Sequence, residues 1–531
     1  MQGAMLKEAL REKGTVLGIA LGVTTAEPFW ELAEILEARR QAGSMADFEE
    51  KDLEKRYRPD LLLAGARSII AVAVPYNALT VATGNVLRSL AGPDPEGKTS
   101  ASGWLPTPWW PSPPISLHAL GRDYHVVVRE KLEQLVAWLS DERKEEFNFH
   151  LQADTGPLVE REVARRAGLG WIGPNASLFV PGFGSLVYLG LLLTTLEIPP
   201  DEPGQVWSRE GGQLRLAMAE LPAKADQAVA DRGAVRAFPG DRQGLDCQGC
   251  GRCVEACPSG ALEASYQLNP ARCLSYWTQS RGFIPEGYRR ILGGRLYGCD
   301  TCQLACPENI TLLRERGLLN EERSAGTRPE EAQGRFSARR LVRGDQGEPV
   351  IEGPAPMPPT GAHPNSVRLR RSIDRVTGPD PAGEVVPEQR PGGLSNQDGE
   401  EEAWRRRLRE EAFPSPLKIL HLSNEEFRRC YGPTAVGWRG RKVLQRNALV
   451  SIGNSLARAP EHLIAREIFP FLSDPRAEIR GQAAWALAQM AQGGRASDRL
   501  IRMVLREAGE RETDGRVQEE ISQILKDLGE E

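Results

Sequence analysis

Apolar positions in the first two hundred residues follow two patterns. Two continuous apolar runs, SIIAVAVPY at 68–76 and LVYLGLLLTT at 186–195, are typical of buried β-strands. Residues 29–40 and 129–139 have the spacing of amphipathic helices instead. This mixture of helical and strand-like segments predicts an α/β or α+β domain.

The last hundred residues carry a helical pattern alone. In AEIRGQAAWALAQM, the residues Ile479, Ala483, Leu487 and Met490 fall on one helical face. Two or three such helices after Asn424 predict a small α-helical repeat domain.

Segments rich in Pro, Gly and charged residues interrupt these patterns. The stretch at 91–114 predicts a loop, and a second polar stretch follows Pro199. Residues 318–414 contain few aromatic residues and predict a long disordered linker. We therefore divide the chain into a mixed domain at 1–240 with insertions near 78–116 and 201–244, a cysteine-rich domain at 241–317, the linker at 318–414 and a helical domain at 415–531.

Composition limits the classes of protein that fit. A length of 531 residues predicts about three to four domains. No run approaches the roughly 18–20 apolar residues that span a bilayer, and the first residues lack a basic segment followed by a long apolar one. We expect a cytoplasmic monomer. The net charge of −5 gives no overall attraction to nucleic acid, although local basic patches are compatible with it.

Eight of the nine cysteines lie between residues 247 and 306, which is typical of a metal site in a reducing compartment. The run DCQGCGRCVEACP at 246–258 has the spacing with which two-cluster ferredoxins hold three thiolates on one cluster and send the fourth to another. YGCDTCQLACP at 297–307 repeats part of it. The sequence therefore predicts two [4Fe-4S] clusters, one held by Cys247, Cys250, Cys253 and Cys306, the other by Cys257, Cys273, Cys299 and Cys302.

Structural zinc is the alternative for these thiols. Zinc favours paired CxxC motifs with four ligands per metal, and a third cysteine at the same spacing disfavours it. Pro258 and Pro307 follow the last cysteine of each motif and fix the turn there. Cys430 stands alone, and we expect it to pack as a small apolar residue.

Five separated blocks resemble epoxyqueuosine reductase. They are RDYHVVVREKL at 122–132, ADTGPLVEREVARRAGLGWIGPNASLFVPGFGSLVYLG at 153–190, RCLSYWTQSRGFIP at 272–285, GGRLYGCDTCQLACPEN at 293–309 and GWRGRKVLQRNALVSIGN at 437–454. The resemblance covers residues 1–77, 117–200, 245–312 and about 420–500, the parts left when the insertions are removed.

The resemblance implies an α+β protein with three folded parts: a corrinoid-binding α/β catalytic domain, a ferredoxin-like module with two [4Fe-4S] clusters and a C-terminal HEAT-like helical domain. It implies reduction of epoxyqueuosine to queuosine at the wobble position of tRNA, with base-off cobalamin and a low-potential electron donor. The histidine-containing DxHxxG loop of other cobalamin proteins is absent, which agrees with a base-off corrinoid.

The resemblance also assigns residues. Asp154, in the DTGP block, matches the family's proton donor, and His125 lies in the active-site block RDYH. Without the resemblance, Asp154 would be expected to cap a helix that begins near Pro157, and His125 to be a polar residue at a helix start. The expected cobalamin contacts are Arg56, His125, Leu178, Leu189 and Ser280.

Arginines near the clusters and at the start of the helical domain are candidates for tRNA phosphates, because their guanidinium groups pair well with such anions. These are Arg281, Arg289, Arg290, Arg295, Arg439, Arg441 and Arg446. The chain departs from the family pattern at Pro174, Leu186 and Glu308, and the loss of a lysine at 174 affects the expected substrate contacts most.

Two other classes of protein fit part of the pattern. A reductive dehalogenase-like corrinoid and iron–sulfur enzyme would share the cluster module, but it gives no reason for a helical repeat domain. A non-catalytic electron-transfer protein would not need the DTGP block.

Overall fold

The computed structural model describes residues 3–76, 114–143, 146–201, 206–210, 213–217, 247, 250–264, 267–315, 412–455, 461–491 and 498–529. Residues 1–320 and 403–531 form one compact unit, and a second unit, 321–402, lies outside the described residues. The predicted linker up to residue 411 and most of the two predicted insertions also lie outside them. Among the described residues, no helix is long and apolar enough to cross a membrane.

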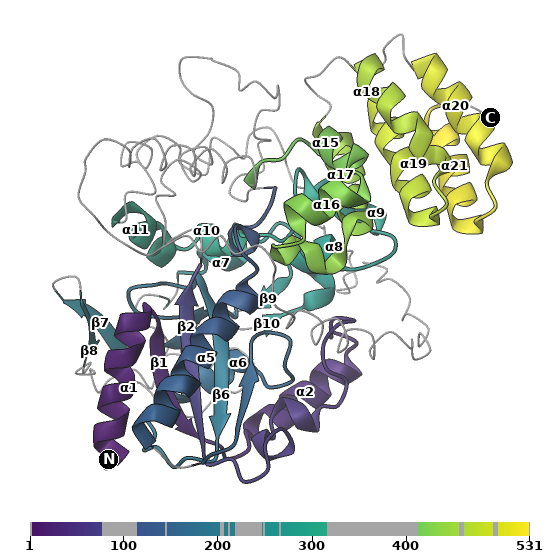
Figure 1. Ribbon diagram of the computed structural model, residues 1–531. Coiled ribbons are helices and arrows are strands. Elements are labelled where there is room, and N and C mark those ends of the chain that lie inside the picture. Colours follow the sequence, from purple (N-terminus) through teal and green to yellow (C-terminus); the bar gives the residue numbers. More distant parts are fainter. Residues whose placement is uncertain are drawn as a thin grey trace, which may run out of the picture. The chain divides into compact units, whose positions relative to one another are not determined.

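A four-stranded antiparallel sheet organises the first two hundred residues (Figure 1). Its order is β1 (Ala20–Thr25), β2 (Ser68–Pro75), β6 (Val187–Thr194) and β3 (Phe149–Gln152). The two apolar runs found in the sequence are β2 and β6, which pair along their whole length from Ser68 opposite Thr194 to Pro75 opposite Val187. Both strands are central, so their side chains are buried on both faces, which explains their continuous apolar character.

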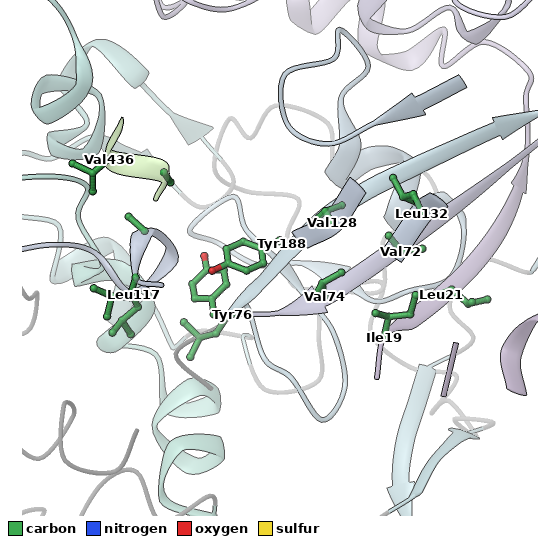
Figure 2. Packing of buried hydrophobic residues seen from close by; sticks show 14 of the residues in the cluster. Ile19, Leu21, Val72, Val74, Tyr76, Leu117, Val128, Leu132, Tyr188 and Val436 are labelled. Carbon is green, nitrogen blue, oxygen red and sulfur yellow. The ribbon is translucent and has the colours of Figure 1, made fainter. Parts of the chain in front are cut away.

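Helices cover both faces of this sheet. Side chains of α1 (Gly3–Leu17) and α5 (Tyr124–Arg143) pack with Leu21, Val72 and other residues on one face. Figure 2 shows Val128 and Leu132 of α5 beside Val72. Those of α2 (Glu31–Gln41) and α6 (Glu160–Arg166) pack on the other. Both helices predicted here are present, α2 for 29–40 and α5 for 129–139.

Shorter elements surround the sheet. Three two-stranded pairs are described, β4 (Trp171–Ile172) with β5 (Leu178–Phe179), β7 (Val206–Glu210) with β8 (Gln213–Ala217), and β9 (Leu262–Ala264) with β10 (Gln267–Leu268). The 3-10 turns are η1 (Glu54–Arg56), η2 (Pro59–Leu61), η3 (Leu117–Ala119) and η4 (Pro270–Arg272). The hairpin of β7 and β8 falls within the insertion predicted near 201–244.

Short helices carry the cysteine-rich region. They are α7 (Arg252–Glu255), α8 (Leu274–Gln279), α9 (Glu286–Leu292), α10 (Thr301–Leu304) and α11 (Pro307–Glu315). Ile115, at the end of the first predicted insertion, is buried and bridges to Tyr297, which ties this region to the sheet domain.

The C-terminal region is helical, as predicted, with more helices than the two or three expected. They are α15 (Pro416–His421), α16 (Asn424–Tyr431), η6 (Ala435–Arg439), α17 (Arg441–Ser455), α18 (Glu461–Ile468), η8 (Phe469–Ser473), α19 (Ala477–Ala491), α20 (Asp498–Arg511) and α21 (Gly515–Asp527). The predicted apolar face of 477–491 is buried in the core. Cys430, expected to pack in a core, is exposed on α16, so that prediction is wrong.

Candidate active site

Each predicted set of four thiols lines its own cavity. Cys247, Cys250, Cys253 and Cys306 surround a cavity of about 250 Å³. Cys257, Cys273, Cys299 and Cys302 line a second cavity of about 320 Å³. Among the described residues, no group of three or more His, Cys, Asp or Glu side chains is arranged to hold a single metal ion. The structure thus brings together the two crossed sets expected from spacing.

The surroundings of the thiols fit bound clusters. Burial raises the pKa of Cys247 and of Cys273 to about 11. A buried thiolate needs a cation to offset its desolvation, and cluster iron supplies that charge. The indole nitrogen of Trp171 is buried without a hydrogen-bond partner, and this indole partly offsets the rise in the pKa of Cys247. A buried donor without a partner therefore lies near the first thiol set.

The second cavity extends from its thiols to an apolar wall. Leu178 from β5 and Leu189 from β6 line it, together with Val187 and Tyr76. Arg161 lies at the same cavity and donates to the carbonyl of Ala176 at 3.1 Å. An apolar wall with few polar groups is what a flat macrocycle requires. The two leucines predicted from the sequence are thus placed beside the second thiol set.

Two other expected cofactor residues lie away from both cavities. The Ser280 hydroxyl is buried and donates to the carbonyl of Trp277 at 3.3 Å. Arg56 forms an ion pair with Glu49, and its carbonyl accepts a hydrogen bond from Val159 just before α6. The structure does not bring either residue to the wall formed by Leu178 and Leu189.

Asp154 lies in the loop between β3 and α6. Its backbone is left-handed, with φ of 59°, a conformation that residues other than glycine rarely adopt. Its Oδ2 accepts a hydrogen bond from the Tyr124 hydroxyl at 2.5 Å and lies 3.3 Å from Nε2 of His125. Helix α6 begins at Glu160, and its N-terminus has no side-chain cap. Asp154 therefore does not cap a helix, and that alternative is wrong.

His125 and Asp154 form a pair in which His125 holds the proton. Burial lowers the pKa of His125, but hydrogen bonds to Asp123 and Asp154 outweigh burial and raise it to about 9. Desolvation by surrounding protein atoms acts to raise the pKa of Asp154, but hydrogen bonds from His125 and Tyr124 outweigh this effect and leave that pKa below its ordinary value. At neutral pH the pair is an imidazolium beside a carboxylate. The Asp154 side chain stays 58% exposed, so a substrate can reach it.

Three tyrosines connect Asp154 to the second thiol set. Tyr124 stacks on Tyr188 with ring centroids 4.9 Å apart, and Tyr188 packs on Tyr76 at 4.7 Å, as Figure 2 shows for the last two rings. Tyr76 lines the same cavity as Cys302. The sequence analysis did not identify these tyrosines, because they come from three separate elements and only folding brings them together.

The arginines fall into three groups. Arg289, Arg295 and Arg446 are buried and bonded within the protein, so their prediction as tRNA contacts is wrong. Arg281 and Arg290 are exposed. Two others are partly buried: Arg439 lies over the Trp438 ring at 3.6 Å, and Arg441 donates to the Leu422 carbonyl and to Asn424.

Two of the three departures from the family pattern lie beside the first thiol set. Pro174 and Glu308 both line its cavity. Leu186 is fully buried in the core on the α1 and α5 side of the sheet. The replaced lysine position is thus next to a cluster cavity, whereas Leu186 is a packing residue.

Two family models match the chain. The model described as "Epoxyqueuosine reductase QueG, DUF1730" matches residues 56–155, and "4Fe-4S double cluster binding domain" matches residues 246–309. Epoxyqueuosine reductase of Bacillus cereus is 29% identical over 527 residues, covering 99% of this chain and 98% of the relative. That of Burkholderia pseudomallei is 33% identical over 312 residues, covering 58% of this chain and 68% of the relative.

Solved structures give the same result. A crystal structure of epoxyqueuosine reductase with an epoxyqueuosine-modified tRNA-Tyr stem loop is 27% identical, covers 99% of this chain and 100% of its own, and has a TM-score of 0.63. A structure of the Bacillus subtilis enzyme, with its catalytic loop swung out of the active site, is 26% identical, covers 99% of both chains and has a TM-score of 0.62.

Proposed function

This chain belongs to the epoxyqueuosine reductase family and reduces epoxyqueuosine to queuosine in tRNA, and we propose that it does so with two [4Fe-4S] clusters, base-off cobalamin and Asp154 as proton donor. The ligands of one cluster are Cys247, Cys250, Cys253 and Cys306, and those of the other are Cys257, Cys273, Cys299 and Cys302. Leu178 and Leu189 form the apolar wall for the corrinoid.

One observation carries this proposal: a single cavity joins the second thiol set to the apolar wall, and stacked tyrosines join that cavity to Asp154. Tyr76 lines the cavity, Tyr188 stacks between Tyr76 and Tyr124, and the Tyr124 hydroxyl bonds to Asp154. An electron-transfer protein needs no exposed carboxyl at the end of such an arrangement. A reductase that must add protons does.

The reaction converts the epoxide to a carbon–carbon double bond and releases its oxygen as water, which takes two electrons and two protons. Bound clusters supply the electrons one at a time, and bound cobalamin is a cofactor able to accumulate them as a strong reductant. The residues of this chain supply one of the two protons, and solvent water supplies the other. Asp154 lies with its carboxyl exposed, and His125 holds the proton that this carboxyl passes to the departing oxygen.

Tyr124 and Asp123 orient these two groups. Asp123 accepts a hydrogen bond from Nδ1 of His125 at 2.7 Å, which directs Nε2 toward Asp154. Tyr124 fixes the Asp154 carboxylate from a second direction. As negative charge develops on the substrate oxygen, the proton moves from His125 to Oδ2 of Asp154 and from there to that oxygen. Asp154 is then a carboxylate again.

For the nucleic acid, we propose that the C-terminal helices form a HEAT-like surface that binds the anticodon stem loop. The exposed Arg281 and Arg290 of the cysteine-rich region are the first candidates for phosphate contacts, followed by Arg439 and Arg441 at the start of the C-terminal region. We also propose Arg56 and Ser280 as cofactor contacts, although neither lines the cavity wall. Arg56 bonds to the segment before α6 through Val159, and Ser280 bonds to the carbonyl of Trp277 on α8. We also propose that the protein is a cytoplasmic monomer. It receives its electrons from a low-potential donor.

The decisive experiment measures tRNA nucleosides by mass spectrometry. A strain that lacks this protein should accumulate epoxyqueuosine and lose queuosine, and expression of the protein should reverse both. In vitro, the anaerobically reconstituted enzyme with a chemical reductant should convert epoxyqueuosine in a tRNA stem loop. Unchanged queuosine in the deletion strain, together with no conversion in vitro, would reject the function and return a small-molecule corrinoid reductase to first place.

A further inference from the structure

The carboxyl group of Glu160 lies directly behind the loop that carries Asp154. Its Oε1 accepts a hydrogen bond from the backbone N–H of Asp154 at 2.7 Å and another from the side-chain amide of Gln152 at 3.1 Å. Glu160 is the first residue of α6, and Gln152 is the last of β3. One carboxyl therefore ties the end of a strand to the start of a helix and holds the residue between them.

Gln152 supports the same loop from inside. Its amide donates to the carbonyl of Leu158 at 2.9 Å and its oxygen accepts from the N–H of Leu158 at 3.1 Å, and its side chain is buried. A Cβ added to Gly156 would meet this side chain at 2.1 Å, so the loop closes tightly over it. Gln152 fixes the two ends of the loop. Glu160 is the side chain that bonds to the Asp154 backbone itself.

The conformation of Asp154 makes that bond important. A left-handed aspartate persists where surrounding contacts determine its backbone. The carboxyl of Asp154 is held by Tyr124 and His125, which both belong to α5. The hydrogen bond that the Asp154 N–H donates to Glu160, the first residue of α6, holds the Asp154 backbone in addition.

We propose that Glu160 is a positioning residue, which keeps the Asp154 loop in its working position by accepting the Asp154 N–H. This inference rests on the proposed function. The Bacillus subtilis relative has been observed with its catalytic loop swung out, so a loop with two positions occurs in the family. In this chain, loss of the Glu160 bond would release the loop from α6 and increase the population in which Asp154 is displaced from His125.

The charge of Glu160 is compatible with this role. Burial, and next the negative charge of Asp154, raise the pKa of Glu160 to about 8, so the group is neutral at pH 7. A neutral carboxyl adds no second negative charge beside Asp154, yet its carbonyl oxygen still accepts the N–H. Glutamine has the same shape, the same acceptor and no charge. It is therefore the conservative replacement, whereas alanine removes the acceptor.

The test compares Glu160→Gln with Glu160→Ala in the full-length enzyme loaded with both clusters and cobalamin. Single-turnover rates with an epoxyqueuosine stem loop and a chemical reductant should fall about 100-fold in Glu160→Ala, the size of effect that misplacing a catalytic group produces. Glu160→Gln should keep most of the wild-type rate at pH 7. Iron content and stem-loop affinity should match wild type in both variants, so the loss appears in the rate and not in binding.

A double substitution separates positioning from general damage to the fold. If Glu160 acts through Asp154, then Asp154→Asn with Glu160→Ala should be no slower than Asp154→Asn alone. Glu162→Ala is the matched control, because Glu162 is buried on the same helix and pairs with Arg165 instead. It should leave the rate unchanged, whatever it costs in stability.

Three results would overturn the inference: a Glu160→Ala rate within twofold of wild type, a Glu160→Gln rate as low as that of Glu160→Ala, or additive losses in the double variant. The second would show that the proton of Glu160, and not its acceptor, is needed. A wild-type enzyme that leaves epoxyqueuosine intact would instead reject the proposed function, so the two failures are distinguishable.

Discussion

His125 lies between two carboxylates, with Nε2 3.3 Å from Oδ2 of Asp154 and Nδ1 2.7 Å from Oδ1 of Asp123. This arrangement assigns different roles to groups that look alike in the sequence. Asp123 is the group that orients the imidazole, and Asp154 is the exposed end of the pair. In the proposed function the working proton resides on His125 at rest, and this lets an aspartate with a lowered pKa act as the acid near neutral pH.

Replacing Asp154 by Asn removes the carboxyl group that passes the proton but keeps the local structure. Asparagine tolerates the left-handed backbone, and its oxygen still accepts the Tyr124 hydroxyl. We expect normal iron content and stem-loop binding, with single-turnover epoxide reduction slowed by about 10² to 10⁴-fold. Rapid-quench assays with chemically reduced enzyme measure this step apart from electron supply. A wild-type rate would end the assignment of Asp154 as the donor.

The His125 pair makes stability depend on pH in a defined window. The pKa of His125 is raised from 6.5 to about 9 in the folded state, so its contribution is fully present below pH 6.5 and is lost as pH rises through 9. The free energies of unfolding of wild type and His125→Gln, measured with denaturant, should therefore differ most near pH 6.5. They should become equal above pH 9. A difference between the two proteins that stays constant from pH 6 to pH 10 contradicts the pairing.

Cys273 provides a selective test of the crossed ligand sets. It lies apart from both cysteine motifs, and it lines the second cavity but not the first. In Cys273→Ala we expect about four irons per chain instead of about eight, since one cluster loses a ligand and the other keeps all four. Iron analysis and electron paramagnetic resonance measure this loss. The exposed Cys430 is the control, and Cys430→Ala should retain both clusters.

The sequence predicted those parts of the fold and site that depend on local patterns. Strands β2 and β6 follow from continuous apolar runs, and the grouping of cysteines follows from ligand spacing. The contacts of Arg446 were not predictable in this way. Its neighbours in the chain suggest a surface helix, but the segment 277–282 packs against α17 and supplies three carbonyl acceptors, at Trp277, Ser280 and Gly282.

The same limit applies to Glu160 and to the stacked tyrosines. Nothing in VEREVARR distinguishes Glu160 from Glu162, because both sit at the start of one helix. Their partners differ: Glu160 bonds to the Asp154 backbone and Glu162 to Arg165. Such roles depend on which segment the folded chain places opposite each residue, and local spacing carries no information about that.

Arg446 should therefore behave as a structural residue. Replacing it with Met keeps much of the volume but leaves the buried Ser280 carbonyl without this donor, together with the less buried carbonyls of Trp277 and Gly282. Each unsatisfied buried group costs about 1–3 kcal/mol, so the free energy of unfolding should fall by at least that amount. Chemical denaturation measures the loss. Stem-loop affinity of the protein that remains folded should equal wild type, and a selective loss of affinity would restore Arg446 as a tRNA contact.

Arg290 should show the opposite behaviour, because its side chain is exposed on α9. In Arg290→Ala we expect unchanged stability, weaker binding of the anticodon stem loop, and a salt dependence of binding reduced by about one phosphate contact. Fluorescence anisotropy at several salt concentrations measures both affinity and slope. Arg67→Ala is the matched control, since Arg67 is 63% exposed in the sheet domain and pairs with Glu197. If both variants bind with the wild-type slope, the exposed arginine of α9 does not contact the RNA backbone.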